Sequence, residues 1–331
     1  MKEYINEQIK CFNPSKNYKN TVSNCKIYHY TSPQGLYGIL KNENFRFTDC
    51  QFLNDKSEYM HIIKQFNKAL DEVKNDLDNE FKSYIISSFK QHKIYSNYGI
   101  DDIEVNNVDS KLSINFTPKR YYVFCTSTSK DSLGMWNYYV KDNNYQGYNI
   151  EISMNQMLES FKTIKNPNAD LYYGKVLYNE REQIKLLKEL LINASTEYKE
   201  NLANAKGDIF SIYAINNQSV IGSVLNYIEN YRLFFKDEAF INENEFRFVL
   251  KLPLDSITNS IKPISNNFII KNGIFTPFCE LPFDKTKLIK SITLSPILEW
   301  EIAKQGLERY LKHHGYNSNI NIVQSVVPIR N

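Results

Sequence analysis

A strand–helix–strand unit from Lys26 to Asp49 constrains the fold more than any other stretch of the chain. Aromatic and β-branched residues up to Thr31 predict a short first strand. The Ser-Pro pair at positions 32 and 33 is typical of a helix start. Apolar residues then recur at helical spacing, and the alternation of Phe45 and Phe47 predicts a returning strand.

Two polar side chains stand out on the first of these strands. His29 and Thr31 lie on either side of Tyr30, so both point to the same side of the sheet. A histidine and a hydroxyl group on one face, just before a helix, form a candidate site in a place expected to be buried. Taken alone, His29 is equally typical of a core histidine with satisfied hydrogen bonds.

Composition excludes several classes of protein. The 331 residues are 42% hydrophobic and 23% charged, which is ordinary for a globular chain, and the net charge of +3 predicts no strong field for nucleic acid or an anionic membrane. The five cysteines are widely spaced and form no CxxC pair, which predicts reduced thiols rather than a zinc site. The polar N-terminus has no signal-peptide core, and no stretch is apolar enough to span a membrane. We therefore expect a cytoplasmic protein with no membrane partner.

The order of predicted elements indicates one α+β domain over residues 1–331. Helical patterns are predicted from about residue 53 to residue 90, from 180 to about 235 and from 296 to 314. The long middle pattern predicts a helical insertion at about 180–236. Strands are predicted at 121–128, 147–153, 171–178, 246–252, 268–270, 274–278, 289–294 and within 320–329.

Polar residues at the ends of two further predicted strands join His29 as candidates. A Ser/Thr run containing Ser127 ends one strand and is followed by a short aromatic helix. Glu243, Glu245 and Arg247 open a later strand at two-residue spacing, which predicts that they share one face. The aromatic residues of the short helix are Trp136, Tyr138 and Tyr139.

Together these residue types suit chemistry at a sugar carbon. A carboxylate stabilises an oxocarbenium-like transition state, an aromatic ring stacks on a flat leaving group, and a histidine orients ribose hydroxyls. Each element also has a structural interpretation. The Ser/Thr run is consistent with a capping turn, the aromatics with core packing, and the glutamates with a surface ladder to Arg247 or Lys251.

The chain resembles a bacterial family catalogued as domain of unknown function 2971 (DUF2971). The layout of the matching pieces in turn resembles the ADP-ribosyltransferase fold, a split β-sandwich that holds NAD between two sheets. It implies a split β-sandwich of this type with a helical insertion. The matching pieces are Tyr28 to Ser32, Gly35-Leu36, Ile39-Leu40, Leu53 to Asp55 with Glu58, Phe124 to Ser127, Met135-Trp136, Phe240 to Arg247 and Ser325 to Arg330.

The resemblance also implies roles for individual residues. Glu245 is implied as the catalytic carboxylate and Glu243 as the second member of a Glu-x-Glu pair. His29, Tyr30 and Thr31 are implied at the NAD ribose, with Ser127 and Arg247 also lining the NAD site. Either Trp136 or Tyr138 would then lie beside the nicotinamide.

The leading hypothesis is an NAD-dependent ADP-ribosyltransferase that modifies a nucleic acid or protein, as a toxin or antiviral defence effector would. NAD is its substrate, and a regulatory partner such as an antitoxin would restrain it. One alternative is an NAD glycohydrolase using the same site, and another is a non-enzymatic module that binds a nucleotide or partner. A cysteine hydrolase using Cys125 and His29 is a further alternative, although the strand pattern favours a buried thiol at Cys125.

Overall fold

The computed structural model describes residues 9–12, 25–53, 57–97, 119–140, 144–164, 169–204, 216–253, 267–271 and 273–328. The chain divides into two compact units. Unit 1 comprises Met1–Asn54, Lys119–Val176 and Ala239–Asn331. Unit 2 comprises Asp55–Pro118 and Leu177–Glu238, so the helical unit includes the predicted insertion and an earlier segment as well. No helix in the described ranges is both long and apolar enough to cross a membrane.

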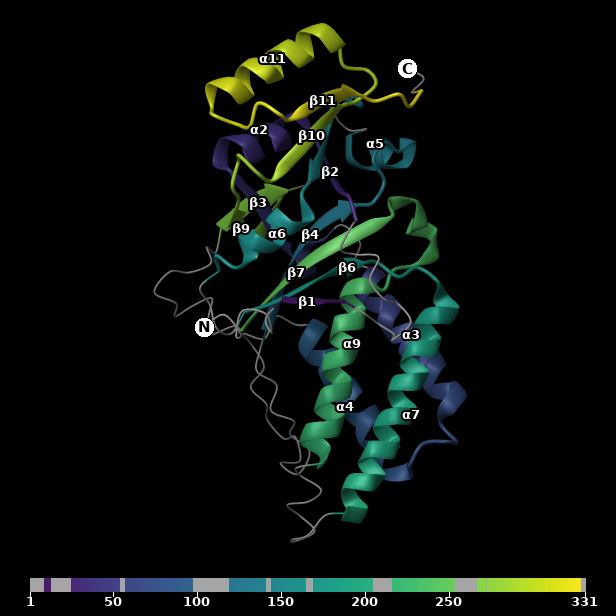
Figure 1. The fold of residues 1–331 in the computed structure, drawn as a ribbon. Helices are drawn as coiled ribbons and strands as arrows, with labels where there is room; N and C mark the ends of the chain where they lie inside the picture. Colours follow the sequence, from purple (N-terminus) through teal and green to yellow (C-terminus); the bar gives the residue numbers. More distant parts are fainter. Residues whose placement is uncertain are drawn as a thin grey trace. The chain divides into compact units, whose positions relative to one another are not determined.

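Unit 1 is built on one mixed sheet, which confirms the α+β class at this level (Figure 1). The strands follow the order β1-β6-β7-β4-β2-β5-β10-β11, with β3, β9 and β8 branching from β4. Only the β1–β6 and β10–β11 pairs are parallel among the pairings described. The strands are β1 (Ile9–Cys11), β2 (Ile27–Thr31), β3 (Asn44–Asp49), β4 (Lys119–Ser127), β5 (Tyr148–Ile152), β6 (Asp170–Lys175), β7 (Glu245–Pro253), β8 (Asn267–Lys271), β9 (Ile274–Pro282), β10 (Ile289–Leu294) and β11 (Asn321–Gln324).

The sheet forks along β4. One edge of this strand pairs with β7 from end to end. The other edge pairs with β3 at Tyr122 and Val123, and with β2 at Ser127. Between these two contacts, β2 and β3 diverge. Strands far apart in sequence are thereby brought to the carboxyl end of β4, where the candidate residues lie.

Two helices of unit 1 correspond to predicted ones. Helix α2 (Pro33–Asn42) begins at Ser32, whose side chain accepts a hydrogen bond of 3.1 Å from the Gly35 amide, as the Ser-Pro start predicts. Helix α11 (Trp300–His313) is capped in the same way by Glu299. The remaining helical segments are η1 (Cys50–Phe52), α5 (Leu133–Val140), α6 (Met154–Phe161) and η5 (Glu238–Glu243).

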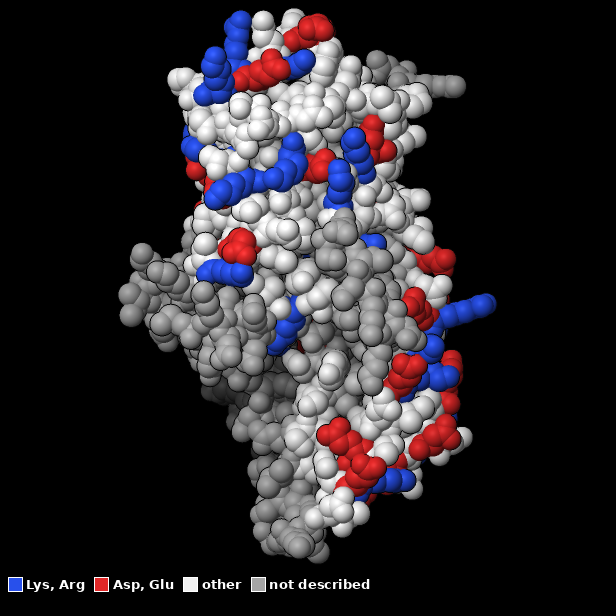
Figure 2. Space-filling model, viewed as in Figure 1, with Lys and Arg blue, Asp and Glu red and all other residues white. Residues whose placement is uncertain are grey.

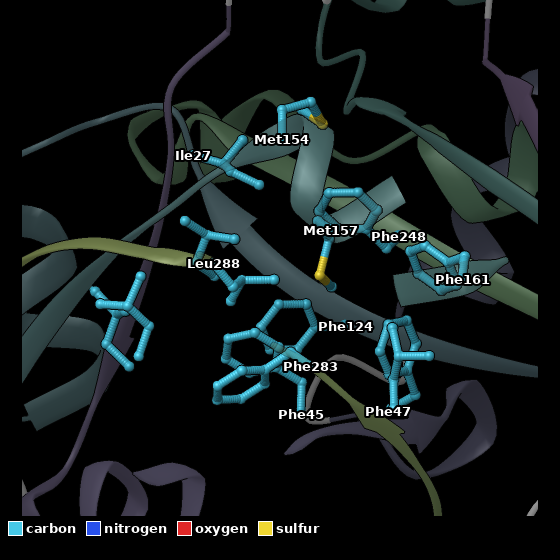
Figure 3. Close-up of a cluster of buried hydrophobic side chains, with 14 of the residues drawn as sticks. Ile27, Phe45, Phe47, Phe124, Met154, Met157, Phe161, Phe248, Phe283 and Leu288 are labelled. Atoms are coloured by element: carbon cyan, nitrogen blue, oxygen red, sulfur yellow. The ribbon is translucent and has the colours of Figure 1, made fainter. Parts of the chain in front are cut away.

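The core of unit 1 lies on one face of the sheet, where aromatic side chains from β3, β4 and β7 gather beneath α6 (Figure 3). Phe45 and Phe124 have ring centroids 4.6 Å apart, and Phe45 also contacts Phe283 at 5.0 Å. Phe161 of α6 stacks on Phe248 at 5.8 Å. This core therefore combines closely packed aromatic rings with aliphatic side chains such as Ile27 and Leu288.

Unit 2 is helical and contains α3 (Ser57–Val73), α4 (Asn79–Asn97), α7 (Glu180–Asn204), the π-helical turn η4 (Asn217–Ile221) and α9 (Gly222–Phe234). A single helix predicted to about residue 90 is in fact two, α3 and α4. Phe66 stacks on Phe89 at 3.9 Å between them. The buried His61 and Gln183 side chains form a 2.8 Å hydrogen bond, which satisfies two polar groups inside the unit.

Candidate functional site

Strands β4 and β7 bring several of the predicted site residues to one face of the sheet. Their antiparallel register sets Ser127 opposite Glu245 and Cys125 opposite Arg247. Residues directly opposite each other in such a pair share a face. This arrangement follows from the two-residue spacing on each strand, and it places a carboxylate, a guanidinium, a hydroxyl and a thiol on the face opposite the aromatic core.

Glu245 and Arg247 form the best-defined interaction of this face. Arg247 Nε donates to Glu245 Oε1 at 2.7 Å, and Nη2 donates to Oε2 at 2.9 Å. Both side chains are buried, with exposures of only 2% and 3%. Charge-assisted bonds in this two-pronged geometry fix the orientation of the carboxylate. Arg247, which the resemblance implies at the NAD site, holds Glu245 in this way.

A turn anchored by Ser127 leads into Glu245. Ser127 Oγ donates to the Glu243 carbonyl at 2.6 Å and accepts from the Ser129 amide at 3.1 Å. Asn244 has a φ of 43°, in the left-handed region that asparagine tolerates well. Glu243 therefore ends helix η5 and does not share a strand face with Glu245 as predicted, although its side chain is also buried.

Tyr139 is a site residue whose place the sequence analysis missed. Its side chain is 39% exposed as a whole, but its hydroxyl end is enclosed. Burial raises the pKa of Tyr139 well above its ordinary value, and the nearby Glu245, Cys125 and Glu243 raise it further while Arg247 lowers it. The phenol is therefore neutral at physiological pH. The available signal for Tyr139 was its helical spacing from Trp136 and Val140, because both of these residues face the sheet.

The two aromatic residues predicted beside the nicotinamide have other environments. Trp136 is fully buried, packs edge-on against Tyr30 at 4.9 Å and donates from Nε1 to Asp131 at 2.7 Å. Its ring is thus a core element and is not available for stacking on a ligand. Tyr138 is 53% exposed on the same helix. Tyr139 is the third aromatic residue of α5, and burial together with the charges of Glu245 and Glu243 raises its pKa.

His29 lies on the opposite face of the sheet from Glu245. The register pairs Tyr28 with Ser127, so Tyr28 shares the Glu245 face and His29 points the other way. The imidazole packs against Phe124 at 4.7 Å and Phe45 at 6.2 Å, both in the aromatic core. The prediction that His29 and Glu245 face each other across one site is therefore not met by this register.

The surroundings of His29 give it a structural role at the fork of the sheet. Its Nδ1 lies 3.1 Å from the carbonyl oxygen of Cys125, which can only accept, so Nδ1 carries the proton and donates. Burial lowers the pKa of His29 to about 4, although the bond to Cys125 raises it. The neutral ring occupies the point where β2 leaves β4, and satisfies a carbonyl there.

The neighbours of His29 on β2 are also engaged in the fold. The Tyr30 hydroxyl donates to the Ser129 carbonyl at 2.9 Å and accepts from the Ser132 amide at 3.2 Å. Thr31 lies against the first turn of α2, where a Cβ on Gly35 would come within 2.0 Å of its Oγ1. Both residues therefore connect β2 to adjacent segments.

Cys125 differs from its expected environment. The sequence pattern favoured a buried thiol, whereas Cys125 is half-buried and lies on the same face as Arg247. The five cysteines, all within the described ranges, form no disulfide bond with one another. Among the described residues, no group of three His, Cys, Asp or Glu side chains is arranged to hold a metal ion.

Comparison with protein families identifies one match. Residues 135–248 match the family model described as "Protein of unknown function (DUF2971)". The match begins in α5 and ends in β7, so Trp136, Tyr139 and the Glu243–Arg247 segment lie inside the matched range. His29, Tyr30, Thr31 and Ser127 lie outside it. No curated protein matches the chain. No solved structure matches it either.

Proposed function

We propose that this protein is an NAD-dependent ADP-ribosyltransferase that uses Glu245 as its catalytic carboxylate. The single observation that carries the proposal is the buried Glu245 carboxylate, which two hydrogen bonds to Arg247 hold in one orientation. A carboxylate that is fixed in a buried site stabilises developing positive charge far better than a carboxylate that must first reorient. The earlier resemblance to the ADP-ribosyltransferase fold, and the forked sheet, support the same class.

The proposed reaction breaks the bond between ribose C1′ and the nicotinamide nitrogen. The bonding electron pair leaves with nicotinamide, and positive charge spreads over C1′ and the ring oxygen. Each oxygen of Glu245 keeps a further lone pair after bonding Arg247, so the carboxylate can still accept from a ribose hydroxyl. An acceptor oxygen or nitrogen then bonds to C1′ and gives up its proton.

Two other side chains have roles in this proposal. Glu243 is buried and lies two residues before Glu245 in the sequence. In this proposal it takes the acceptor's proton or positions the acceptor. Tyr139, neutral at physiological pH, donates a hydrogen bond to the nicotinamide ribose. His29 and Thr31 are assigned no contact with NAD, because they lie on the aromatic-core face of the sheet.

The acceptor is proposed to be a nucleic acid or a protein. On the face shown in Figure 2, basic and acidic side chains of the described residues are interspersed, without a large area of one sign. With a net charge of +3, non-specific attraction to phosphate is weak, and acceptor choice depends on local contacts. A toxin or defence effector of this kind would be restrained by a regulatory partner. With water as the acceptor, the same site would act as an NAD glycohydrolase.

A second candidate is a non-enzymatic module, which two observations favour. Trp136 is buried in the core, and both oxygens of Glu245 already bind Arg247. A buried ion pair that is fully engaged is also a common structural element. Such a module would bind a nucleotide or a partner without releasing nicotinamide.

One experiment separates these candidates. Purified protein is incubated with cell extract and NAD labelled on its adenylate phosphate, and free nicotinamide is measured by chromatography. We expect label on protein or nucleic acid together with nicotinamide release. Label found only as free ADP-ribose would identify hydrolysis. If the wild-type protein and the Glu245→Gln variant both bind NAD but neither releases nicotinamide from it, the binding module is favoured.

A further inference from the structure

The β8–β9 hairpin exposes more large apolar side chains than any other short segment described. Phe268, Ile270 and Phe275 are 60%, 63% and 67% exposed, and Ile269 and Ile274 are 40% and 54% exposed. The register pairs Ile270 with Phe275 directly, so Phe268, Ile270 and Phe275 share one face of the hairpin. Clustered exposure of this kind marks an interaction surface.

Strand β8 also ends one branch of the described sheet. Among the described strands it pairs with β9 alone, so no other described strand lies along the second edge of its central residues, Phe268 to Ile270. Proteins commonly protect such an edge with charge, proline or a bulge. The central residues of β8, Phe268, Ile269 and Ile270, provide none of these. The edge therefore has both the backbone groups and the apolar side chains that a further strand would use.

We propose that β8 pairs antiparallel with β8 of a second copy of this chain, forming a symmetric dimer. The sequence of β8 is self-complementary about Ile269. With the two-fold axis at Ile269, Phe268 lies opposite Ile270 of the second copy, and Asn267 lies opposite Lys271. Apolar side chains then meet apolar ones on the same face, and the two lysines are at opposite ends.

The exposed area fits a dimer. Aromatic side chains have about 150–250 Å² each, so the two phenylalanines leave roughly 250 Å² in water. Together with the three isoleucines, the apolar area lies at the upper end of the roughly 300–600 Å² found on typical monomers. A standard interface buries about 800 Å² per partner, and the paired backbone and flanking side chains supply the remainder.

The first test is the oligomeric state of the full-length protein. We expect sedimentation or light scattering to give twice the monomer mass of 38.9 kDa. Ile270→Lys should raise the dimer dissociation constant by about 30-fold or more, because an unpaired charge is buried at the seam. Ile302→Lys is the matched control, since Ile302 is 74% exposed on α11 and the same charge is added there. Circular dichroism establishes that both variants fold.

The second test identifies the seam. Directly opposed residues in an antiparallel pair have Cα atoms about 4.5–5.5 Å apart, within the range of a disulfide. Under mild oxidation, Ile269→Cys should give a reducible dimer, whereas Ile274→Cys and the wild-type chain with its own five cysteines should not. A wild-type protein that stays monomeric, or an Ile269→Cys protein that does not cross-link, would overturn the proposal. Monomers that bind lipid vesicles through Phe268 and Ile270 would overturn it in favour of a membrane surface.

Discussion

Glu245 and Arg247 lie two residues apart on one face of β7 and are joined by two hydrogen bonds of 2.7 and 2.9 Å. The pair is almost completely removed from water. Desolvating two charges is costly, and their mutual attraction often does no more than offset that cost. The pair therefore does more to define one orientation of the carboxylate than to add stability, which is the property that the proposed chemistry requires.

Replacing Glu245 by glutamine should affect turnover more than binding. Glutamine keeps the shape and one acceptor oxygen but removes the charge that stabilises the transition state. We expect nicotinamide release to slow by ~100-fold or more, with little change in NAD affinity. Rates under single-turnover conditions and NAD binding by calorimetry measure the two quantities separately.

The control for this variant is Glu280→Gln on β9. Glu280 also lies near an arginine, with 3.8 Å between Arg46 Nε and Glu280 Oε1, but this pair is partly exposed. The Glu280→Gln variant should leave turnover unchanged. Because removing one partner of a buried pair costs about 3–5 kcal/mol, unfolding curves must show that Glu245→Gln remains folded. A folded variant with normal nicotinamide release contradicts the catalytic role.

The neighbouring tyrosines of α5 should behave differently. Tyr139→Phe removes a hydroxyl whose pKa is raised by burial and by the charges of Glu245 and Glu243, whereas Tyr138→Phe alters a more exposed side chain. We expect Tyr139→Phe to lower turnover by about 10-fold or more, in keeping with the loss of a hydrogen bond that strengthens in the transition state. Tyr138→Phe should match the wild-type protein.

The pH dependence provides a second measurement on Tyr139. Since its pKa lies well above the ordinary value of 10.0, the phenol remains protonated across neutral and moderately alkaline pH. We expect no loss of activity from tyrosine ionisation as the pH rises from 7 to 9. Equal activity of Tyr139→Phe and Tyr138→Phe would remove Tyr139 from the site.

The main elements of unit 1 were predictable because their signals are local. The Ser-Pro helix start and the alternation of Phe45 and Phe47 correspond to α2 and β3 as observed. The spacing of Glu245 and Arg247 also indicated that they could pair, but on the surface, whereas the structure buries the pair. Two-residue periodicity indicates which side chains of a strand share a face, and this part of the site needs no long-range information.

The facing of His29 could not be predicted in the same way. Periodicity groups His29 with Thr31, but which side of the sheet they face depends on the pairing of Tyr28 with Ser127, about a hundred residues away. A shift of one residue in that register would reverse every side chain of β2. Trp136 illustrates a similar limit, because its burial depends on Asp131 and Tyr30.

His29 should make folding stability depend on pH. Its pKa is about 4 in the folded protein and about 6.5 when the chain is unfolded. The unfolded state therefore binds more protons between these values, so stability is complete above pH 6.5 and declines as the pH falls toward 4. The total change is about 3 kcal/mol.

Chemical unfolding at pH 7 and pH 5 measures this dependence. His29→Gln keeps a neutral donor for the Cys125 carbonyl, so its stability should change less between the two pH values. His313→Gln, at the exposed end of α11, is the control and should retain the wild-type difference. If His29→Gln retains that difference as well, His29 is not the group responsible.

Asp131 should be more important for stability than its position in a loop suggests. Its side chain accepts three hydrogen bonds, from Trp136 Nε1 at 2.7 Å, Ser325 Oγ at 2.7 Å and the Val326 amide at 3.0 Å. It thereby joins the segment after β11 to the helix that carries Tyr139. Asp131→Ala leaves the buried indole N–H without an acceptor, and each such group costs about 1–3 kcal/mol. We expect a loss of at least about 2 kcal/mol in the free energy of unfolding. Protease cleavage near Ser325 should become faster.

Asp284→Ala is the control, because Asp284 is exposed and bonds mainly to Thr286, two residues further along the chain. Wild-type stability in Asp131→Ala would show that Trp136 and the C-terminal segment are held by packing alone.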